Sequence, residues 1–272
     1  MPRDGAELYE RLAAGPVVVL ATVQEVEIKA RLAVGETLRG DNVPAAVRLA
    51  YRGANLERRP GSPAFEMVDH ETAIFVLEPW VDSRGEQPAP DLFQQAAGHG
   101  SRISLPPEGG EALLAAARTI VAYQDGTMAP GESPADWLAS PNPWLQDAAL
   151  NLGAQFAMAT PDWIPGLLEQ SQSASAVRRR HAAKALAQAI ERGRLPLAAN
   201  AAETDLQRTT REIVVQLART DPDETVRRAA VLALLQLQKT YKDAEEILRA
   251  IARDDPSQEV RYEAAAGLLR GR

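Results

Sequence analysis

The sequence contains no cysteine. That absence excludes disulfide bonds, thiolate nucleophiles, cysteine zinc sites and a lipidated N-terminal cysteine in the chain as given, and it leaves the redox compartment open. Histidine is scarce, with three residues in 272, and aromatic residues make up 5% of the chain. Catalytic and metal-binding chemistry that depends on cysteine or histidine therefore has few residues to use.

Long apolar runs are also missing. The longest candidate, Val17 to Ala21, has the length of a strand and falls far short of the ~20 residues that a membrane-spanning helix needs. The first residues lack the apolar core of a secretory signal. As the chain stands we expect a cytoplasmic protein without a membrane span, and an extracytoplasmic one if a signal sequence has been removed.

A basic excess is the third absence. The formal net charge is −7, and neither half of the chain is basic overall. Binding to a phosphate backbone needs clustered positive charge, so the overall balance disfavours nucleic acid as a partner. One basic cluster stands out, formed by Arg178, Arg179, Arg180, Lys184, Arg192 and Arg194. Its simplest interpretation is a solvated helix face.

The N-terminal half has the pattern of a small β domain. Strands are predicted at 17–23, 26–32, 46–51, 72–78 and 102–105, with helices at 7–14 and 108–123. Segments rich in Gly, Pro and Asp separate the strands. Several short strands divided by turns are typical of a closed barrel or a sandwich.

Three segments in this half resemble a known family. They are Val17-Val18-Val19-Leu20-Ala21-Thr22-Val23, Leu38-Arg39-Gly40-Asp41, and Phe65 followed by Thr72-Ala73-Ile74-Phe75-Val76-Leu77-Glu78. In this order they are similar to bacterial relatives of the netrin-like OB barrel, over residues 16–105. The resemblance implies an OB-type barrel and, as one alternative function, an inhibitor or auxiliary of an exported enzyme. Tissue inhibitors of metalloproteinases share that fold but act through an N-terminal cysteine, so their activity is not carried over.

A Gly/Pro/Ser-containing linker at 125–134 is predicted to separate two domains. We expect a β-barrel domain with a packed helix at 1–124 and an α-helical domain at 135–272. The predicted fold class is therefore α+β and multidomain.

The C-terminal half contains an internal repeat. Asp221-Pro222, Val226-Arg227 and Leu234 recur 34 residues later as Asp255-Pro256, Val260-Arg261 and Leu268. Two further copies begin at Trp144 and Arg178. The fifth place of the four copies is always Ala and the ninth is always Leu, namely Ala148, Ala182, Ala230 and Ala264, and Leu152, Leu186, Leu234 and Leu268. The Arg178 copy lacks the Asp-Pro pair and has Arg where Val is expected, so its register stays open by one residue.

A second apolar helix precedes three of the copies, at 163–168, 213–218 and 247–252. Antiparallel helix pairs at this period stack into a solenoid, and an insertion within 191–205 accounts for the longer middle interval. Asp221 and Asp255 are predicted to be N-caps. Proline would then follow at the first helical position, and Glu224 and Gln258 would complete capping boxes.

The pattern Asp-Pro-x-x-x-Val-Arg-x-x-Ala is similar to HEAT-like repeats, including the short bacterial form related to phycobilisome lyase repeats. The resemblance implies about four helix pairs and a protein-binding scaffold, with the second helix of each pair lining a concave surface. In such repeats the arginine at the position of Arg179, Arg227 and Arg261 commonly bonds an aspartate of an adjacent turn. We therefore expect these three arginines to be structural.

The next position in each repeat is the candidate partner surface. Gln146, Arg180, Arg228 and Tyr262 are expected to project along one face, with Leu150, Lys184, Leu232 and Ala266 one turn further on. Exposed Arg and Tyr beside apolar residues are typical of partner anchors. The predicted partner-binding residues are Gln146, Arg180, Lys184, Arg228, Leu232 and Tyr262.

Residues that could carry chemistry are scattered. Asp69-His70-Glu71 cannot converge on one ion from a strand, because consecutive side chains alternate faces. His99 lies between two glycines, and His181 is expected on a helix surface. No serine lies in a nucleophile elbow and no glycine-rich loop opens a helix. We expect no enzyme, no metal and no cofactor.

The leading hypothesis is a protein- or peptide-binding scaffold that acts through the concave face of the solenoid. A nucleic-acid-binding module is the alternative from another class, since Arg180, Lys184, Arg228 and Tyr262 could follow a phosphate backbone. The partner's identity and the oligomeric state are left open by the sequence.

Overall fold

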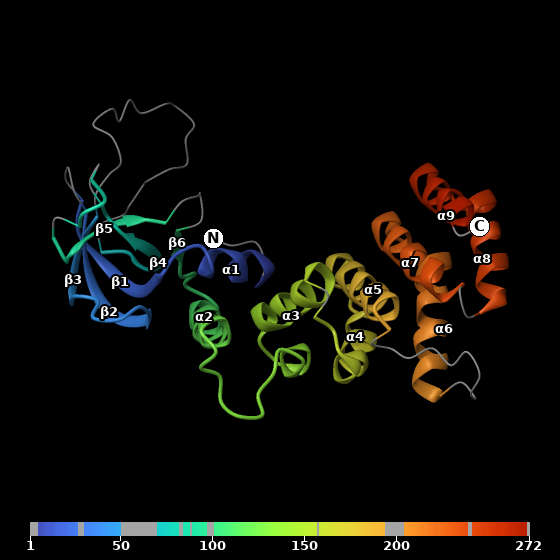
Figure 1. Cartoon of the computed structure of the whole chain (residues 1–272), viewed down its shortest axis with the longest axis horizontal. Helices are drawn as coiled ribbons and strands as arrows, with labels where there is room; N and C mark the ends of the chain where they lie inside the picture. The colour runs from blue at the N-terminus through green and yellow to red at the C-terminus, as the bar shows by residue number, and fades with distance from the viewer. Residues whose placement is uncertain are drawn as a thin grey trace. The chain divides into compact units, whose positions relative to one another are not determined.

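The structure is a computed structural model that describes residues 5–26, 30–49, 70–81, 84–87, 89–96, 101–156, 158–193, 204–238 and 241–270. The chain divides into two compact units, Met1–Glu132 and Ser133–Arg272. Figure 1 shows strands in the first unit and pairs of helices in the second. The predicted fold class, a β-barrel followed by a helical repeat region, is confirmed.

Five strands of the first unit close into a barrel. They are β1 (Val17–Val26), β2 (Ala30–Arg39), β3 (Ala46–Leu49), β4 (Thr72–Pro79) and β5 (Leu92–Gln95). Their order is β1-β2-β3-β5-β4, and β4 pairs back with β1. The β3–β5 pair is parallel and the other pairs are antiparallel. A short strand β6 (Arg102–Ser104) pairs with the N-terminal part of β4, on the edge that β5 occupies further along.

The barrel is filled by side chains with the period of two that strands impose. Along β1 the residues Val17, Val19, Ala21 and Val23 all enter one core cluster, which also holds Phe75 from β4. Ile74, on the opposite face of β4, is buried too. Both faces of β4 are therefore covered, which explains its nearly continuous apolar sequence.

One strand prediction is wrong and one strand was missed. The segment 26–32 is not one strand, because Val26 ends β1 and pairs with Ala30 at the start of β2. Val26 and Ala30 are four residues apart in the sequence, and four is an even number. The alternation of apolar and polar residues therefore continues from β1 into β2, and it gives no sign that the chain reverses between them. Strand β5 was not predicted, because Leu92 and Phe93 are the only strongly apolar residues of its four.

Arg39 at the end of β2 connects the barrel to its two flanking helices, α1 (Gly5–Leu12) and α2 (Gly110–Gln124). Its guanidinium donates to the Leu12 and Gly15 carbonyl oxygens at 2.6 and 3.3 Å. It also donates to Gln124 Oε1 at 2.6 Å and to Asp125 Oδ1 at 2.7 Å. A single side chain thus joins β2, the end of α1 and the end of α2.

The second unit is a series of helix pairs. Its short 3₁₀ helices are η1 (Asp136–Ala139) and η2 (Pro161–Trp163), and its α-helices are α3 (Pro143–Gln155), α4 (Ile164–Gln170), α5 (Ala176–Glu191), α6 (Asp205–Thr220), α7 (Glu224–Leu237), α8 (Lys242–Asp254) and α9 (Gln258–Arg270). Each pair has a first helix that packs against a second helix, and the pairs are η1–α3, α4–α5, α6–α7 and α8–α9. The second helices also pack against one another in the order α3, α5, α7 and α9. Figure 1 shows α5, α7 and α9 side by side.

Small residues let these second helices approach closely. The four repeated alanines, Ala148, Ala182, Ala230 and Ala264, are all completely buried. A Cβ on Gly267 of α9 would lie 2.3 Å from Leu235 Cδ1 of α7, so any larger residue there would require the Leu235 side chain to move. The contact between neighbouring second helices therefore depends on alanine and glycine facing larger apolar residues.

The predicted N-caps are wrong by two residues. Asp221 and Asp255 close the preceding helices as C-caps. The N-cap of α7 is Asp223, whose carboxylate accepts from the backbone N–H groups of Thr225 and Val226. Pro222 consequently lies in the connecting turn and not in the first helical turn.

None of the described helices is long and apolar enough to cross a bilayer.

Candidate functional site

Pairs of arginine and aspartate hold successive second helices together. Arg179 on α5 donates through Nε and Nη2 to the two carboxylate oxygens of Asp221, at 2.7 and 2.9 Å. Arg227 on α7 repeats this contact with Asp255, at 2.9 and 3.1 Å. These hydrogen bonds raise the pKa of both guanidinium groups. The expected structural role of Arg179 and Arg227 is confirmed.

Hydrogen bonds to the turn before the helix are common to Arg179, Arg227 and Arg261. In each, Nη1 donates to the carbonyl oxygens six and five residues earlier. The acceptors are Ser173 and Ala174 for Arg179, Asp221 and Pro222 for Arg227, and Asp255 and Pro256 for Arg261. The identical geometry fixes the register of the Arg178 copy, which the sequence left open by one residue.

Two residues of the predicted surface have other roles in α3. Gln146 is engaged on both sides of its amide: Nε2 donates to the Ser140 carbonyl oxygen at 2.7 Å, and Oε1 accepts from Arg178. Arg178 also donates to Asp147 Oδ1 at 2.7 Å. Leu150 is completely buried, so its placement on the exposed face was wrong. The α3 end of the predicted surface is thus largely committed to internal packing.

The remaining residues form an exposed row across α5, α7 and α9, which we call the basic stripe: Arg180, Lys184, Arg228, Leu232 and Tyr262. Arg180 is half-buried, and Lys184 and Arg228 are exposed. Leu232 and Tyr262 keep 37% and 72% of their surface exposed. Ala266, one turn beyond Tyr262, is half-buried. The stripe therefore combines three cations with two solvent-facing apolar side chains.

The cations of the basic stripe repel one another. Burial lowers the pKa of Lys184, and the positive charges of Arg180 and Arg228 lower it further. Arg228 is partly compensated by Glu263, whose Oε2 lies 3.2 Å from the Arg228 Nε. Among the described residues no carboxylate forms an ion pair with Arg180 or Lys184. This part of the stripe has an unmatched positive charge.

His181 lies next to the stripe. Its Nε2 is 3.5 Å from Arg180 Nη2, and the residue is half-buried on α5. The Nε atom of Arg180 is buried without a hydrogen-bond partner in the described structure. The guanidinium is therefore incompletely satisfied within the chain.

The other candidate residues that the structure describes do not assemble a chemical centre. Asp69 and His99 lie outside the described residues. His70 adopts a left-handed backbone conformation with φ 65°, and Glu71 accepts from the Ser104 hydroxyl at 2.5 Å. Among the described residues, no three His, Asp or Glu side chains are grouped to hold a metal ion.

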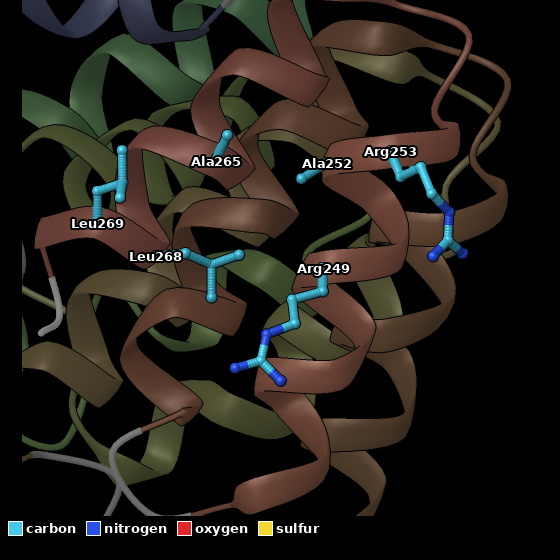
Figure 2. A pocket seen from close by; sticks show the side chains of 6 residues that line it. All are labelled: Arg249, Ala252, Arg253, Ala265, Leu268 and Leu269. Carbon is cyan, nitrogen blue, oxygen red and sulfur yellow. The ribbon is translucent and has the colours of Figure 1, made fainter.

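A hollow on the last helix pair was not predicted. It has a volume of about 390 Å³ and lies between α8 and α9, lined by Arg249, Ala252, Arg253, Ala265, Leu268 and Leu269 (Figure 2). The repeat pattern does not mark it, because Val231 and Leu234, at the repeat positions of Ala265 and Leu268, are completely buried in the preceding pair.

Comparison with known protein families supports the prediction of HEAT-like repeats in the helical half. Residues 164–269, from α4 into α9, match the family model for HEAT repeats. No curated protein matches the chain, and no solved structure does. The C-terminal region is therefore similar to HEAT repeats over these residues, and such repeats commonly mediate protein interactions.

Proposed function

We propose that this chain is a non-enzymatic scaffold whose HEAT repeats bind an acidic segment of a protein partner through the basic stripe. The observation that carries the proposal is the positive charge of Arg180 and Lys184, which no carboxylate among the described residues matches. Burial lowers the pKa of Lys184, and the charges of Arg180 and Arg228 lower it further. An anionic partner would relieve this repulsion, and Leu232 and Tyr262 would supply apolar contact area beside it.

The arginine–aspartate pairs support binding to a preformed surface. Arg179–Asp221 connects α5 to the turn before α7, and Arg227–Asp255 connects α7 to the turn before α9. These contacts fix the spacing of the three helices that carry the stripe. A partner would then lose little free energy to ordering of the scaffold itself.

The packing of the helices supports a concave location for the stripe. Helix α7 contacts α9 more extensively than α6 contacts α8. Closer packing in the row of second helices places that row on the inner side of a curved stack. A concave face surrounds an extended peptide on two sides, which suits a short acidic segment.

For the N-terminal unit we propose an OB-type barrel of the netrin-like kind as a domain separate from the solenoid. The closed order β1-β2-β3-β5-β4-β1 with a parallel β3–β5 pair supports a five-stranded Greek-key barrel. We place the domains at 1–124 and 135–272 with a linker at 125–134.

The test is a cross-linked pull-down from the source cell with three forms of the chain. The stripe variant carries Arg180→Glu, Lys184→Glu and Arg228→Glu. The matched control carries the same charge change at three exposed arginines away from the stripe, Arg192→Glu, Arg208→Glu and Arg219→Glu.

A protein that is retained by wild type and control but lost from the folded stripe variant supports the proposal. The proposal is wrong if the wild type retains no protein that the stripe variant loses. Material that nuclease removes would instead favour nucleic acid as the ligand of the stripe.

A further inference from the structure

Unmatched positive charge in the basic stripe is concentrated at its α5 end. Arg180 and Lys184 are four residues apart on α5, which places their Cβ atoms about 6 Å from each other. Among the described residues, no carboxylate pairs with either side chain. Two uncompensated cations therefore lie within one helical turn.

Arg180 is held in place while part of its guanidinium stays available. The residue is half-buried, and its Nε is enclosed without a hydrogen-bond partner in the described structure. Nη2 lies 3.5 Å from His181 Nε2, whereas Nη1 makes no hydrogen bond with any described residue. Because the side chain is already partly ordered by burial, a ligand that accepts from Nη1 loses little free energy to ordering it.

The α9 end of the stripe has a balanced charge. Arg228 Nε lies 3.2 Å from Glu263 Oε2, and Arg228 Nη1 lies 3.9 Å from Glu259 Oε2. Glu263 Oε1 is also 3.4 Å from Arg270 Nη2. Two arginines and two glutamates thus surround the exposed ring of Tyr262. A run of carboxylates along the whole stripe would meet Glu259 and Glu263 here, and like charges brought together weaken binding.

The two ends therefore favour different parts of a ligand. At α5 the stripe offers two cations to one concentrated negative charge. At α7 and α9 it offers the apolar surfaces of Leu232 and Tyr262 and has no excess of positive charge. A phosphoryl group supplies about −1.5 to −2 charge and three acceptor oxygens at one point, whereas a single carboxylate supplies one negative charge.

We propose that the basic stripe recognises a phosphoserine or phosphothreonine in an extended segment of the partner protein. The phosphoryl group binds Arg180 and Lys184, and apolar side chains of the same segment contact Leu232 and Tyr262. This inference rests on the proposed function of the stripe and narrows its ligand from an acidic segment to a phosphorylated one.

The spacing of the helices sets the spacing of the ligand residues. Packed helices lie about 8–10 Å apart, and an extended chain advances about 3.3 Å per residue. Leu232 on α7 is thus reached about three residues from the phosphorylated residue, and Tyr262 on α9 about five or six residues from it. Either chain direction satisfies these distances.

The probe is a synthetic peptide of alanine and glycine, labelled with fluorescein. It carries one phosphoserine, a leucine about three residues away and a phenylalanine about six residues away, and it is made in both chain directions. Comparison peptides have serine, a single glutamate or a run of glutamates in place of the phosphoserine. Fluorescence anisotropy measures the binding of each peptide to the full chain in a phosphate-free buffer.

We expect saturable binding of the phosphopeptide in one direction, at least about tenfold tighter than that of the serine or single-glutamate peptide. Arg180→Gln combined with Lys184→Gln is expected to weaken it at least about tenfold. Lys184→Gln alone, at an exposed position, should weaken it at least about threefold. The matched control, Arg192→Gln with Arg219→Gln, also removes two exposed cations and should leave the affinity unchanged.

The apolar contacts have their own variant. Leu232→Ser combined with Tyr262→Ser removes two exposed side chains and is expected to weaken phosphopeptide binding at least about fivefold. Unchanged affinity would reduce the ligand to the phosphoryl group alone and overturn recognition of an extended segment. Thermal unfolding of each variant verifies that it is folded.

Three outcomes overturn the phosphoryl proposal. In the first, the oligoglutamate peptide binds as tightly as the phosphopeptide and loses affinity in the Arg180→Gln, Lys184→Gln variant, which leaves the acidic-segment function intact. In the second, the phosphopeptide fails to bind at about 1 mM in either direction, and the pull-down then decides separately whether the stripe retains a protein. In the third, a single-stranded RNA of equal charge displaces the phosphopeptide at a lower concentration than the unlabelled phosphopeptide does, which assigns the stripe to nucleic acid.

Discussion

Arg227 and Arg261 occupy the same repeat position but differ in what their removal exposes. Asp255 is buried and its carboxylate depends on Arg227, whereas Arg261 binds only carbonyl oxygens within the described structure. We expect Arg227→Met to lower the free energy of unfolding by about 3–5 kcal/mol, because it leaves a buried carboxylate unpaired. Arg261→Met is the matched control, with an expected loss below about 1.5 kcal/mol. Urea unfolding of both variants measures the difference, and equal losses would contradict the assigned roles.

Lys184 provides a second prediction for a single residue. Its pKa is lowered, so between that pKa and the ordinary value of 10.5 the unfolded chain binds more protons than the folded chain. Stability contributed by this group therefore rises as pH increases through that window. We expect Lys184→Gln to remove this rise.

At neutral pH, Lys184→Gln is also expected to stabilise the chain by a few tenths of a kcal/mol, since it removes repulsion at an exposed position. The gain should shrink as salt is added. Thermal unfolding at low and high ionic strength measures it. A loss of stability at low salt would mean that Lys184 has an attractive partner.

At the scale of one helix, α7 begins at Asp223. The Thr225 hydroxyl, which donates to the Asp223 carboxylate at 2.6 Å, lowers the pKa of this group, and two backbone N–H groups lower it further. We expect Asp223→Ala to cost about 0.5–2 kcal/mol. Because the folded pKa lies below the ordinary value of 3.8, the stabilisation is complete above pH 3.8 and is lost as pH falls through the folded pKa.

Asp223→Asn is the control for this cap. Its amide oxygen still accepts the backbone hydrogen bonds, so most of the neutral-pH stability is retained while the acid-range dependence disappears. Chemical unfolding of the three proteins at pH 7 and pH 3 measures both effects. Equal acid sensitivity in Asp223→Asn and wild type would exclude Asp223 as the titrating group.

The elements differ in how far the sequence predicts them. Helix pairs could be predicted because each repeat buries the same alanine, the first three copies also bury the same leucine, and a 34-residue recurrence leaves few alternatives. Helix starts were placed two residues early because Asp221 and Asp255 satisfy the sequence rule for a cap while bonding arginines of another helix. Strand β5 has too few apolar residues to show an alternating pattern. Its position depends on pairing with β3 and β4, which only the closed barrel defines.

Across the whole molecule, the candidate surface was partly predictable. Repeat alignment identifies positions that face one side, and Arg180, Lys184, Arg228, Leu232 and Tyr262 lie there. It does not report what covers each position, so Gln146 and Leu150 were misjudged. The hollow between α8 and α9 escaped prediction for the same reason, since Leu269 is exposed whereas Leu235, at the same repeat position, is half-buried.

The division into two compact units leads to a last prediction. If the barrel and the solenoid are independent domains, each has its own core and its own unfolding transition. Ala230→Leu overpacks the buried seam of α7 and should cost about 1–3 kcal/mol in the solenoid alone. Arg39→Met removes the side chain that joins β2, α1 and α2, so it should lower the barrel transition alone.

Differential scanning calorimetry of wild type and the two variants separates these effects. Ala265→Leu, at an exposed position of α9, is the matched control for added volume and should change stability by less than about 0.5 kcal/mol. Each of the two core variants is expected to shift one transition and leave the other in place. If either variant shifts both transitions together, the units unfold as one cooperative body and the proposed domain boundary within 125–134 is wrong.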